Sequence, residues 1–478
     1  MLRRATLQRS LALAVAFVLT PRGALAAPGA PAPPAATATS APPSTPPQQA
    51  GSAVPPPPAG APTPATQTPP QAGPGALTID EAVQLVLSRN ERARISDLNV
   101  TVADAAVEKA RAGFLPVLTF NGNDTRTGVI AAGAPANVAT GSLVLTQPLL
   151  NPSAFPLYAQ AKALAEAQRA QNTDDKRLLA FSAANAFFTV LSTSAILDAA
   201  QRQLENAQAN VADTQARADA QLNSSNDVTR ARVDVAGASR ELEADKGALA
   251  NDYVQVAFLL NSPVSGPLAS PGAMLAAAQQ PFGAIDGLVR IAFDRRPDVL
   301  VDKNATDAAH HFADEPMMRL IPSVGLTGTA SGTTNAPAAT KVWNQETVAG
   351  TLTWTIYDAG SRYADKHSRD AQAEIAELNL KQLVRNVDAQ VRGTAALLSA
   401  AQAEFQVAAQ ARDAAQQNVE ETAILYRQGL AKAIELIDAS DSRFTAEVNY
   451  AGAQFSVAMA YLNLRQAMGL DPLGTELK

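Results

Sequence analysis

The strongest constraint in this sequence is a pair of very long stretches that are almost free of helix-breaking residues. Residues 153–222 and 360–428 contain almost no proline or glycine. A helix rises 1.5 Å per residue, so roughly 70 helical residues would extend about 100 Å, far beyond the size of a compact globular domain. Each stretch meets a turn, near residues 223–226 or near Gly429, and continues into a shorter returning helix. The sequence therefore predicts two long helical hairpins.

The apolar residues of the second stretch repeat at intervals of seven. One row consists of Val384, Val391, Leu398 and Phe405, and a neighbouring row of Leu380, Val387, Thr394, Ala401 and Ala408. A seven-residue repeat favours left-handed coiled-coil packing of helices. Many of the remaining positions are alanine, which allows helix backbones to approach closely. We therefore expect rods of paired helices rather than a globular bundle.

An internal duplication covers most of the chain. LPVLTFNG at Leu115 matches IPSVGLTG at Ile321, an offset of 206 residues. LTQPLLNPS matches LTWTIYDAG at an offset of 207, and AFLLNSP matches RQAMGLDP at an offset of 208. A chance similarity would not keep its offset over three landmarks. The sequence therefore predicts one structural half made twice, with the first repeat at 77–271 and the second at 272–478.

Each repeat has the same order of predicted elements. A single helix comes first, over about 78–113 and again over about 282–314, and a strand, a loop, a second strand and the two long helices follow. We expect Asp314-Glu315-Pro316 to interrupt the second of these opening helices, because proline removes a backbone donor and clashes with the preceding turn.

The predicted strands alternate between apolar and polar residues. In Val348–Tyr357 the even positions carry valine, glycine, leucine, tryptophan and isoleucine, and the odd positions are rich in threonine. This period of two fits a membrane β-barrel with a lipid face and a water face. It fits a half-buried hairpin of a soluble protein equally well. Four strands cannot close around a lumen, so a barrel would require several chains.

The beginning of the chain has the features of an exported protein. Residues 1–26 combine a basic segment, a short apolar core and an Ala-Leu-Ala site, which predicts a secretory signal peptide. Residues 27–76 hold 17 of the 32 prolines and no charged residue, so we expect a disordered, extended tether. The chain has no cysteine and therefore no N-terminal lipid attachment. We expect no later apolar run to reach the length of a transmembrane helix.

The composition gives little support to enzymatic activity or nucleic-acid binding. The formal net charge is −6 and no basic cluster is present, which argues against nucleic acid as a partner. No phosphate-binding loop, dinucleotide-binding glycine pattern or nucleophile motif occurs. His310 and His311 each have an acid four residues later, Asp314 and Glu315, but this spacing alone is a weak metal signal. We predict no catalytic residue, no cofactor and no metal site.

Three motifs in their order and spacing resemble the TolC family of outer-membrane efflux proteins. LTIDEAVQLVLSRN is similar to the family's opening helix, LTQPLLN to a strand-to-helix junction, and YRQGLAKAIELIDA to the second hairpin tip. The resemblance covers about residues 77–474. It implies a mainly α-helical chain with four β-strands, a homotrimer in outer-membrane lipid with one twelve-stranded barrel, and a helical tunnel in the periplasm. It also implies two partners, a periplasmic adaptor protein and an inner-membrane transporter of the RND, MFS or ABC class.

Two acids at the second tip match the family's motif. Glu435 and Asp438 lie three residues apart, so they share one helical face. In a trimer they would form two carboxylate rings at a channel constriction, favouring cations over anions. The alternative is an ordinary solvated helix start, where acids are stabilised by the helix dipole.

The resemblance also implies a lock between the two hairpins at the closed entrance. Tyr426 matches the tyrosine of that lock and Asp227 its acidic partner, while the arginine position is Ala431, with Lys432 beside it. We expect the turn residues to form the adaptor-docking surface. These residues are Gln221, Leu222, Asn223, Gly429, Leu430 and Ala431.

These features together predict a passive exit duct for efflux of small toxic compounds. The first alternative is the outer-membrane component of a type I protein secretion system, which uses the same kind of channel body. The second is a periplasmic coiled-coil protein without a pore, which would explain the helices but not the matched pairs of alternating strands.

Overall fold

The computed structural model describes residues 76–128, 137–222, 224–264, 266–333 and 345–474. The chain divides into residues 1–69, which lie outside these ranges, and a compact unit of residues 70–478. The predicted signal peptide and nearly all of the predicted tether therefore fall outside the described residues. Both sets of repeated elements lie within the one compact unit.

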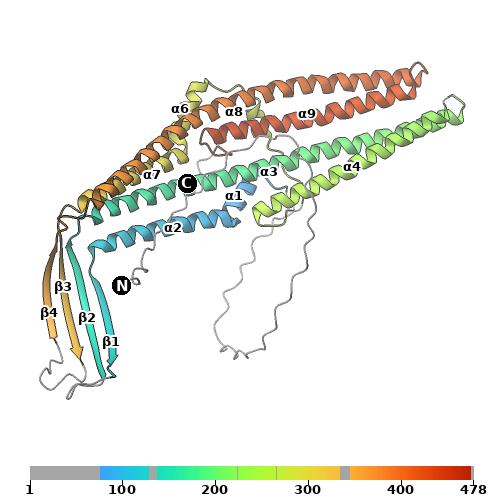
Figure 1. The fold of residues 1–478 in the computed structure, drawn as a ribbon. Helices are drawn as coiled ribbons and strands as arrows, with labels where there is room; N and C mark the ends of the chain where they lie inside the picture. Colours follow the sequence, from blue (N-terminus) through green and yellow to red (C-terminus); the bar gives the residue numbers. More distant parts are fainter. Residues whose placement is uncertain (1–75, 129–136, 223, 265, 334–344, 475–478) are drawn as a thin grey trace, which may run out of the picture. The chain divides into compact units, whose positions relative to one another are not determined.

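Four long helices form two antiparallel hairpins, as the sequence predicted (Figure 1). α3 (Ala154–Asp219) has 66 residues and α8 (Ser361–Arg427) has 67. Each turns back into a shorter helix, α4 (Ser225–Leu260) or α9 (Ala433–Ala467). At 1.5 Å per residue the longer helices extend about 100 Å. The turns lie at the end of the unit that is opposite to the strands.

The seven-residue rows form the core of the second hairpin. Val387, Val391 and Leu398 are almost fully buried, together with Phe405. Val384 departs from the prediction because its side chain remains 36% exposed. The burial of successive members of one row shows that the heptad repeat does bring these positions to the packing face.

A second core surrounds α3 and is shared by both hairpins, because α9 contributes Phe455, Ala458 and Leu462 to it. Phe181, Phe187 and Phe188 pack with Val256 and Leu260 of α4. α3 is also long and apolar enough to cross a membrane by length and composition, so the prediction that no such run exists was wrong. The most apolar window is 44% buried within the chain, since its phenylalanines fill this core.

The two opening helices are each broken once, whereas the sequence predicted single helices. α1 (Ile79–Arg89) and α2 (Glu91–Arg111) meet at Asn90, and α6 (Ile285–Arg295) and α7 (Pro297–Met318) meet at Arg296. The short α5 (Gly272–Ala278) precedes α6.

Both breaks have an identifiable physical cause. The Asn90 side chain accepts a hydrogen bond from the Arg92 amide (2.9 Å) and donates one to the Leu259 carbonyl (2.7 Å), so it caps α2 and binds the end of α4. Arg296 precedes Pro297, and a residue before proline is restricted to extended backbone.

Pro316 does not interrupt α7, and the prediction that it would was wrong. Proline cannot donate to the carbonyl four residues earlier, which belongs to Phe312. The Arg369 guanidinium of α8 donates to that carbonyl instead (3.0 Å) and also to the buried Glu315 (2.6 Å). Arg319 binds Glu315 from the next turn (2.8 Å). A tertiary contact therefore satisfies the group that the proline leaves free.

The strands form one antiparallel sheet in the order β1-β2-β3-β4. They are β1 (Val117–Arg126), β2 (Asn137–Leu150), β3 (Ser323–Thr333) and β4 (Gln345–Thr353). A short 3₁₀ turn, η1 (Ala112–Phe114), leads from α2 into β1. β2 and β3 come from different repeats, so the central pairing joins the two halves. Within the described residues, the outer edges of β1 and β4 remain unpaired.

The strand register places apolar and polar residues on opposite faces of the sheet. Leu118 pairs with Leu145, and Phe120 with Leu143. The same face continues across β3 and β4, where its further large residues are Val324, Leu326, Val348 and Leu352. The opposite face carries mainly serine, threonine and asparagine, such as Thr119, Ser142, Thr329 and Thr351.

β4 is shorter than the predicted strand Val348–Tyr357. It ends at Thr353, which pairs with Ser323, the first residue of β3, so the following residues have no strand to pair with. The Trp354 indole donates to the Leu320 carbonyl (3.0 Å), and Arg362 binds the Thr355 carbonyl (2.8 Å). These side-chain contacts replace the ladder between β4 and α8.

Both hairpin tips close with the same backbone turn. At the first tip, Leu222 donates to the Arg217 carbonyl (2.8 Å), and at the second, Leu430 donates to the Leu425 carbonyl (2.9 Å). This six-to-one bond defines a Schellman motif, which needs a left-handed residue just before it. That residue is Gly429 (φ 76°) at the second tip but Gln221 (φ 62°) at the first. A side chain in this conformation costs about 1 kcal/mol.

A pair of substitutions tests this difference between the tips. Gln221→Gly should stabilise the first tip by up to about 1 kcal/mol, and Gly429→Ala should destabilise the second by a similar amount. Space is not limiting at Gly429, because an added Cβ would meet nothing within 4 Å. Hydrogen exchange of the Leu222 and Leu430 amides reports the free energy of opening at each tip. Equal exchange in parent and variants would contradict the strain argument.

Candidate functional site at the hairpin tips

The two predicted constriction acids lie on the first turns of α9. Glu435 and Asp438 are both exposed. Glu435 Oε2 accepts a hydrogen bond from the Lys432 backbone amide (3.3 Å), so this carboxylate caps the start of its own helix. Among the described residues, nothing donates a hydrogen bond to the Asp438 carboxylate. The two acids share a face but have different local contacts.

Asp227 occupies the equivalent position at the first tip and has the same local role as Glu435. Its Oδ2 accepts from the Ser224 amide (3.3 Å), which completes a capping box at the start of α4. Sequence reasoning assigned Asp227 only to the lock with Tyr426. Helix capping by this acid is a contact that the S-x-x-D spacing could have indicated.

Tyr426 is buried beneath the second tip, where its side chain is 3% exposed. Its hydroxyl lies 3.4 Å from the Thr214 hydroxyl of α3. The Arg217 guanidinium lies over its ring, 4.3 Å from the centroid, and donates to the Tyr426 carbonyl (2.9 Å). The structure thus places an arginine at this tyrosine, but the arginine comes from the first hairpin. Sequence reasoning missed Arg217 because nothing in its local pattern distinguishes it from other helix-surface arginines.

The other predicted residues are divided between the surface and a small apolar cluster. Lys432 is exposed at the start of α9, and its side chain makes no ion pair with any described residue. Ala431 packs against the cluster of Tyr426, Ala433 and Leu436.

The turn residues present apolar side chains to solvent. Leu222 is 74% exposed and Leu430 is 73% exposed, at matching positions of the two tips. Gln221 and Gly429 are exposed beside them. Asn223 lies outside the described residues. A pair of exposed leucines at turn apices is a surface that a partner protein can cover, since large apolar side chains gain free energy on burial.

Two more acids, Asp441 and Asp234, lie farther from the tip along α9 and α4. Burial and the nearby charge of Asp438 raise the pKa of Asp441, which accepts a hydrogen bond from the buried Gln203 of α3 (3.0 Å). Burial and the charge of Asp441 also raise the pKa of Asp234 of α4. The ionised forms of these two acids are therefore disfavoured where α3, α4 and α9 pack together.

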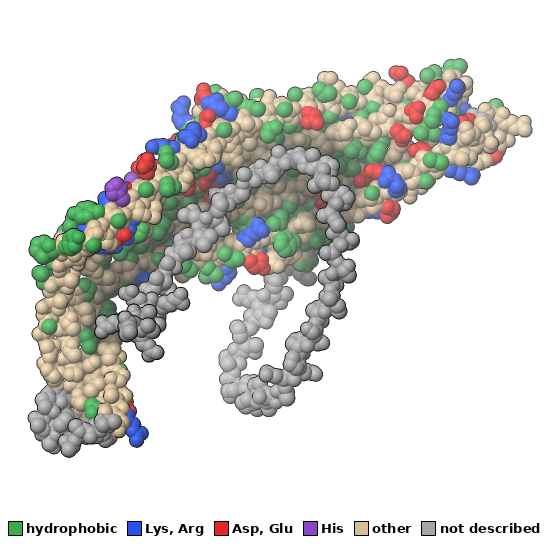
Figure 2. Space-filling view, viewed as in Figure 1, with side chains coloured by type: hydrophobic (Ala, Val, Ile, Leu, Met, Phe, Trp, Pro, Cys, Tyr) green, Lys and Arg blue, Asp and Glu red, His purple; other side chains and the backbone are tan. Residues whose placement is uncertain are grey.

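The sheet end has the side-chain distribution of a membrane segment. The charged residues of the four strands are Asp124, Arg126 and Glu346, all at the end of the sheet farther from the helices. At the other end, exposed aromatic residues lie around the strand-to-helix junctions, namely Phe155, Trp354, Tyr357 and Tyr363. In Figure 2, charged side chains gather over the helices, and large apolar ones lie where helices and strands meet. An uncharged band bordered by aromatic residues is typical of a membrane barrel.

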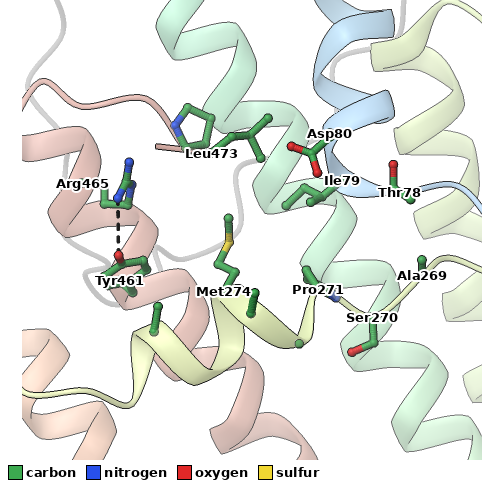
Figure 3. A pocket seen from close by; sticks show the side chains of 14 residues that line it. Thr78, Ile79, Asp80, Ala269, Ser270, Pro271, Met274, Tyr461, Arg465 and Leu473 are labelled. Carbon is green, nitrogen blue, oxygen red and sulfur yellow. Dashed lines mark hydrogen bonds between the residues drawn. The ribbon is translucent and has the colours of Figure 1, made fainter. Parts of the chain in front are cut away.

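A cavity of about 440 Å³ lies far from the tips, between the starts of α1 and α5 and the end of α9 (Figure 3). Arg465 is its cationic lining residue. The Arg465 side chain donates to the Asp471 carbonyl (2.6 Å) and to the Tyr461 hydroxyl (3.4 Å), so it holds the chain after α9 in place. The remaining lining residues offer no paired acid and base.

The weak metal signal at the histidines does not develop into a site. His310 Nε2 lies 3.1 Å from Glu377 on α8, and Glu315 is bound by two arginines. Within the described ranges, no group of three or more histidine, cysteine or acidic side chains could hold a metal ion.

Comparison with known proteins agrees with this architecture. The model of the family described as "Outer membrane efflux protein" matches residues 82–262 and 288–470. The toluene efflux pump outer membrane protein TtgC of Pseudomonas putida is 24% identical over 416 residues, covering 82% of each chain. The outer membrane protein TolC of Salmonella enteritidis is 24% identical over 415 residues, covering 83% of this chain and 84% of that protein. The MtrE outer membrane channel of Neisseria gonorrhoeae superposes with a TM-score of 0.72 at 18% identity, covering 84% of this chain and 91% of that chain.

The family match includes both repeats and most of the compact unit. The chain therefore belongs to the outer membrane efflux protein family, and it is the outer-membrane channel of an efflux pump. Members of this family are channels rather than enzymes.

The raised pKa of Asp441 gives a pH-dependent prediction. The pKa of Asp441 in the folded protein lies above the ordinary value of 3.8. The unfolded chain therefore loses this proton at a lower pH than the folded protein does, so the free energy of unfolding falls as the pH rises above 3.8. Asp441→Asn should therefore raise the melting temperature at pH ~7, and the gain should disappear below about pH 3.8. The side-chain oxygen of the introduced asparagine can still accept the hydrogen bond from Gln203. The control is Asp294→Asn, which replaces an exposed acid of α6. It should leave the melting temperature unchanged both at neutral pH and in acid. A stabilisation that persists in acid would contradict the burial argument.

Proposed function

We propose that three copies of this chain assemble into a passive exit duct that carries small toxic compounds through the periplasm and out across the outer membrane. One observation carries the proposal. The sheet has an apolar face, a polar face and, among the described strands, two unpaired edges, and it is joined directly to helices of about 100 Å.

The sheet explains why several copies are needed. Unpaired backbone groups cannot remain exposed to lipid, so the edges of β1 and β4 must each find a partner strand. Three sheets of four strands make a barrel of twelve, which is an even number within the range of outer-membrane barrels. Barrels with more than eight strands leave space inside for a lumen. The threonine-rich face would then line the lumen, and the leucine-rich face would contact lipid.

The tips of the helical hairpins supply the closed end of the duct. In a trimer, exposed Glu435 and Asp438 would converge near the axis as two rings of carboxylates. Charges of like sign held close together favour bound cations, which relieve their repulsion. The entrance therefore selects cations over anions while it is closed.

The partners follow from the family and the exposed tips. A periplasmic adaptor protein would cover the turn apices with Leu222 and Leu430, and an inner-membrane transporter of the RND, MFS or ABC class would supply the energy. The name of TtgC gives toluene as the substrate of that pump. Support for small toxic compounds as the substrates of this chain comes from such relatives. No bond is made or broken, and no cofactor is needed.

Type I protein secretion remains the second candidate, because the same channel body could serve an exported polypeptide. The identity of the genes next to the gene for this protein distinguishes efflux from secretion. A drug-type transporter with its adaptor favours efflux, and a toxin or protease with an ABC exporter favours secretion. A periplasmic rod without a pore would leave the apolar face of the sheet without a function.

Single-channel conductance in planar bilayers tests the acidic entrance. The parent should prefer cations and be blocked by a trivalent cation added on the side of the tips. Glu435→Gln with Asp438→Asn should weaken that block by about tenfold, or ~1.4 kcal/mol. Glutamine can accept the same hydrogen bond from the Lys432 amide, so the start of α9 should persist.

The matched control removes two acids with the same spacing at the other end of the long helices. Glu374→Gln with Glu377→Gln on α8 should leave the block unchanged. An equally strong block in the parent and in the Glu435, Asp438 double variant would show that these acids do not line the constriction. A parent protein without any conductance would contradict the duct itself.

A further inference from the structure

A row of ion pairs joins α2 to α3, which pack side by side in opposite directions (Figure 1). Asp97 of α2 pairs with Lys176 of α3 (2.6 Å between the charged atoms). Seven residues further along α2, Asp104 pairs with Arg169 of α3 (2.6 Å). Each step of seven residues on α2 thus matches a step of seven in the opposite direction on α3, and an acid faces a base at both positions.

The third position of this row holds two cations instead. The same step of seven residues leads to Arg111 on α2 and to Lys162 on α3. The antiparallel packing continues beyond this position, because the rings of Phe114 and Phe155 lie 5.0 Å apart, so the register places the two cations opposite each other. Both side chains are exposed, and within the described ranges neither forms an ion pair.

The two cations border the aromatic residues at the junction with the sheet. Phe114 packs with Phe155 and Tyr158. Lys162 Nζ lies 6.0 Å from the centroid of the Tyr158 ring, so the ammonium extends along α3 toward the sheet. Phe155 remains 57% exposed. Aromatic residues at the edge of a membrane segment lie at the level of the lipid headgroups, and a lysine can place its charge there while its stem covers apolar surface.

The second repeat does not contain this pair of cations. Met317 stands at the position that corresponds to Arg111, 206 residues later. Arg369 corresponds to Lys162 at an offset of 207, and its guanidinium already binds the buried Glu315 (2.6 Å). The duplication therefore provides an internal comparison. The cation of the second repeat is neutralised by an acid, whereas the two cations of the first repeat face each other.

We propose that Arg111 and Lys162 bind the phosphate of an anionic phospholipid in the leaflet of the outer membrane that faces the periplasm. This inference rests on the proposed function, in which the sheet spans the membrane and the helices continue into the periplasm. The planar fork of arginine binds two phosphate oxygens at once, and lysine adds a point charge. A bound anion relieves the repulsion between the two cations, and the exposed Phe155 ring contacts the acyl chains.

The charges of this site favour an anionic headgroup over a zwitterionic one. Two cations face the phosphate, and the third position of the row holds no acid that could bind a headgroup ammonium. Basic residues beside a membrane segment attract anionic lipid in the same way. The site therefore distinguishes phosphatidylglycerol from phosphatidylcholine.

Native mass spectrometry of the detergent-purified oligomer tests this site by titration with single lipids. The parent should bind dioleoylphosphatidylglycerol about tenfold more tightly than dioleoylphosphatidylcholine. Arg111→Gln with Lys162→Gln should remove this preference and leave the binding of dioleoylphosphatidylcholine unchanged.

The matched control removes one lysine and one arginine of the second repeat. Lys303 of α7 and Arg385 of α8 are also exposed and form no ion pair with a described residue. Lys303 lies about 22 Å from the end of α7 that leads to the sheet, at 1.5 Å per residue. Lys303→Gln with Arg385→Gln should therefore keep the full preference for dioleoylphosphatidylglycerol. An equal loss of the preference in this control would overturn the site.

Arg111→Glu separates lipid binding from helix packing. The new acid faces Lys162 and repeats the acid–base arrangement of Asp97 and Asp104, so the melting temperature without lipid should not fall. The preference for dioleoylphosphatidylglycerol should nevertheless be lost. If the double glutamine variant does not assemble, Arg111→Glu decides, because a preference that persists in it would overturn the site.

Further outcomes identify the source of the phosphate and separate this site from the duct. Excess inorganic phosphate should not displace dioleoylphosphatidylglycerol from the parent, and displacement would overturn the assignment to lipid. A parent that conducts but binds both lipids equally would overturn the lipid site and leave the duct intact. A parent that prefers dioleoylphosphatidylglycerol but does not conduct would overturn the duct and not the lipid site.

Discussion

The unpaired backbone of the sheet edges is the constraint on which the rest of the structure depends. Among the described strands, β1 and β4 have free edges, and they belong to different repeats. In water such edges could be covered by charged side chains or left hydrated. Here the apolar face carries charge only at the end of the sheet farther from the helices, so its remainder places the edges in lipid, where unpaired amides and carbonyls are very costly. The duplication raises the number of strands per chain from two to four, but it still leaves two edges without a partner strand. Assembly of several copies must therefore provide partner strands for the edges of β1 and β4.

The helices convert this membrane segment into a duct with a distant entrance. β2 runs into α3 and β4 leads into α8, so each repeat connects one strand to one long rod. Burial of Val391 and Leu398 in heptad packing, and of the phenylalanines of α3, stabilises these rods. The tips differ from the rods because they combine exposed acids, exposed leucines and an arginine contact between hairpins.

Much of this architecture could be predicted from local sequence patterns. Long helices follow from the absence of helix breakers, and the strands from their period of two. Errors arose where a distant contact decided the outcome. Arg369 supplies the bond that Pro316 lacks, Asn90 binds the end of α4, and Trp354 replaces the ladder after β4. Arg217 illustrates the same limit at the site, since its partner Tyr426 lies 209 residues away in the sequence. Glu435 and Asp438 were predicted from a motif, but the capping role of Glu435 needed the helix start to be located.

Disulfide trapping between strand edges tests the central claim most directly, because the chain has no cysteine of its own. One cysteine is introduced in β1, at Thr119 or Asn121, and one in β4, at Thr347 or Thr351, all on the polar face of the sheet. Oxidation in outer membranes should link β1 of each copy to β4 of the next, giving covalent dimers first and then a closed ring of three chains. Single-cysteine variants should give no ladder. Exclusive formation of monomers linked from β1 to β4 within one chain would contradict the account.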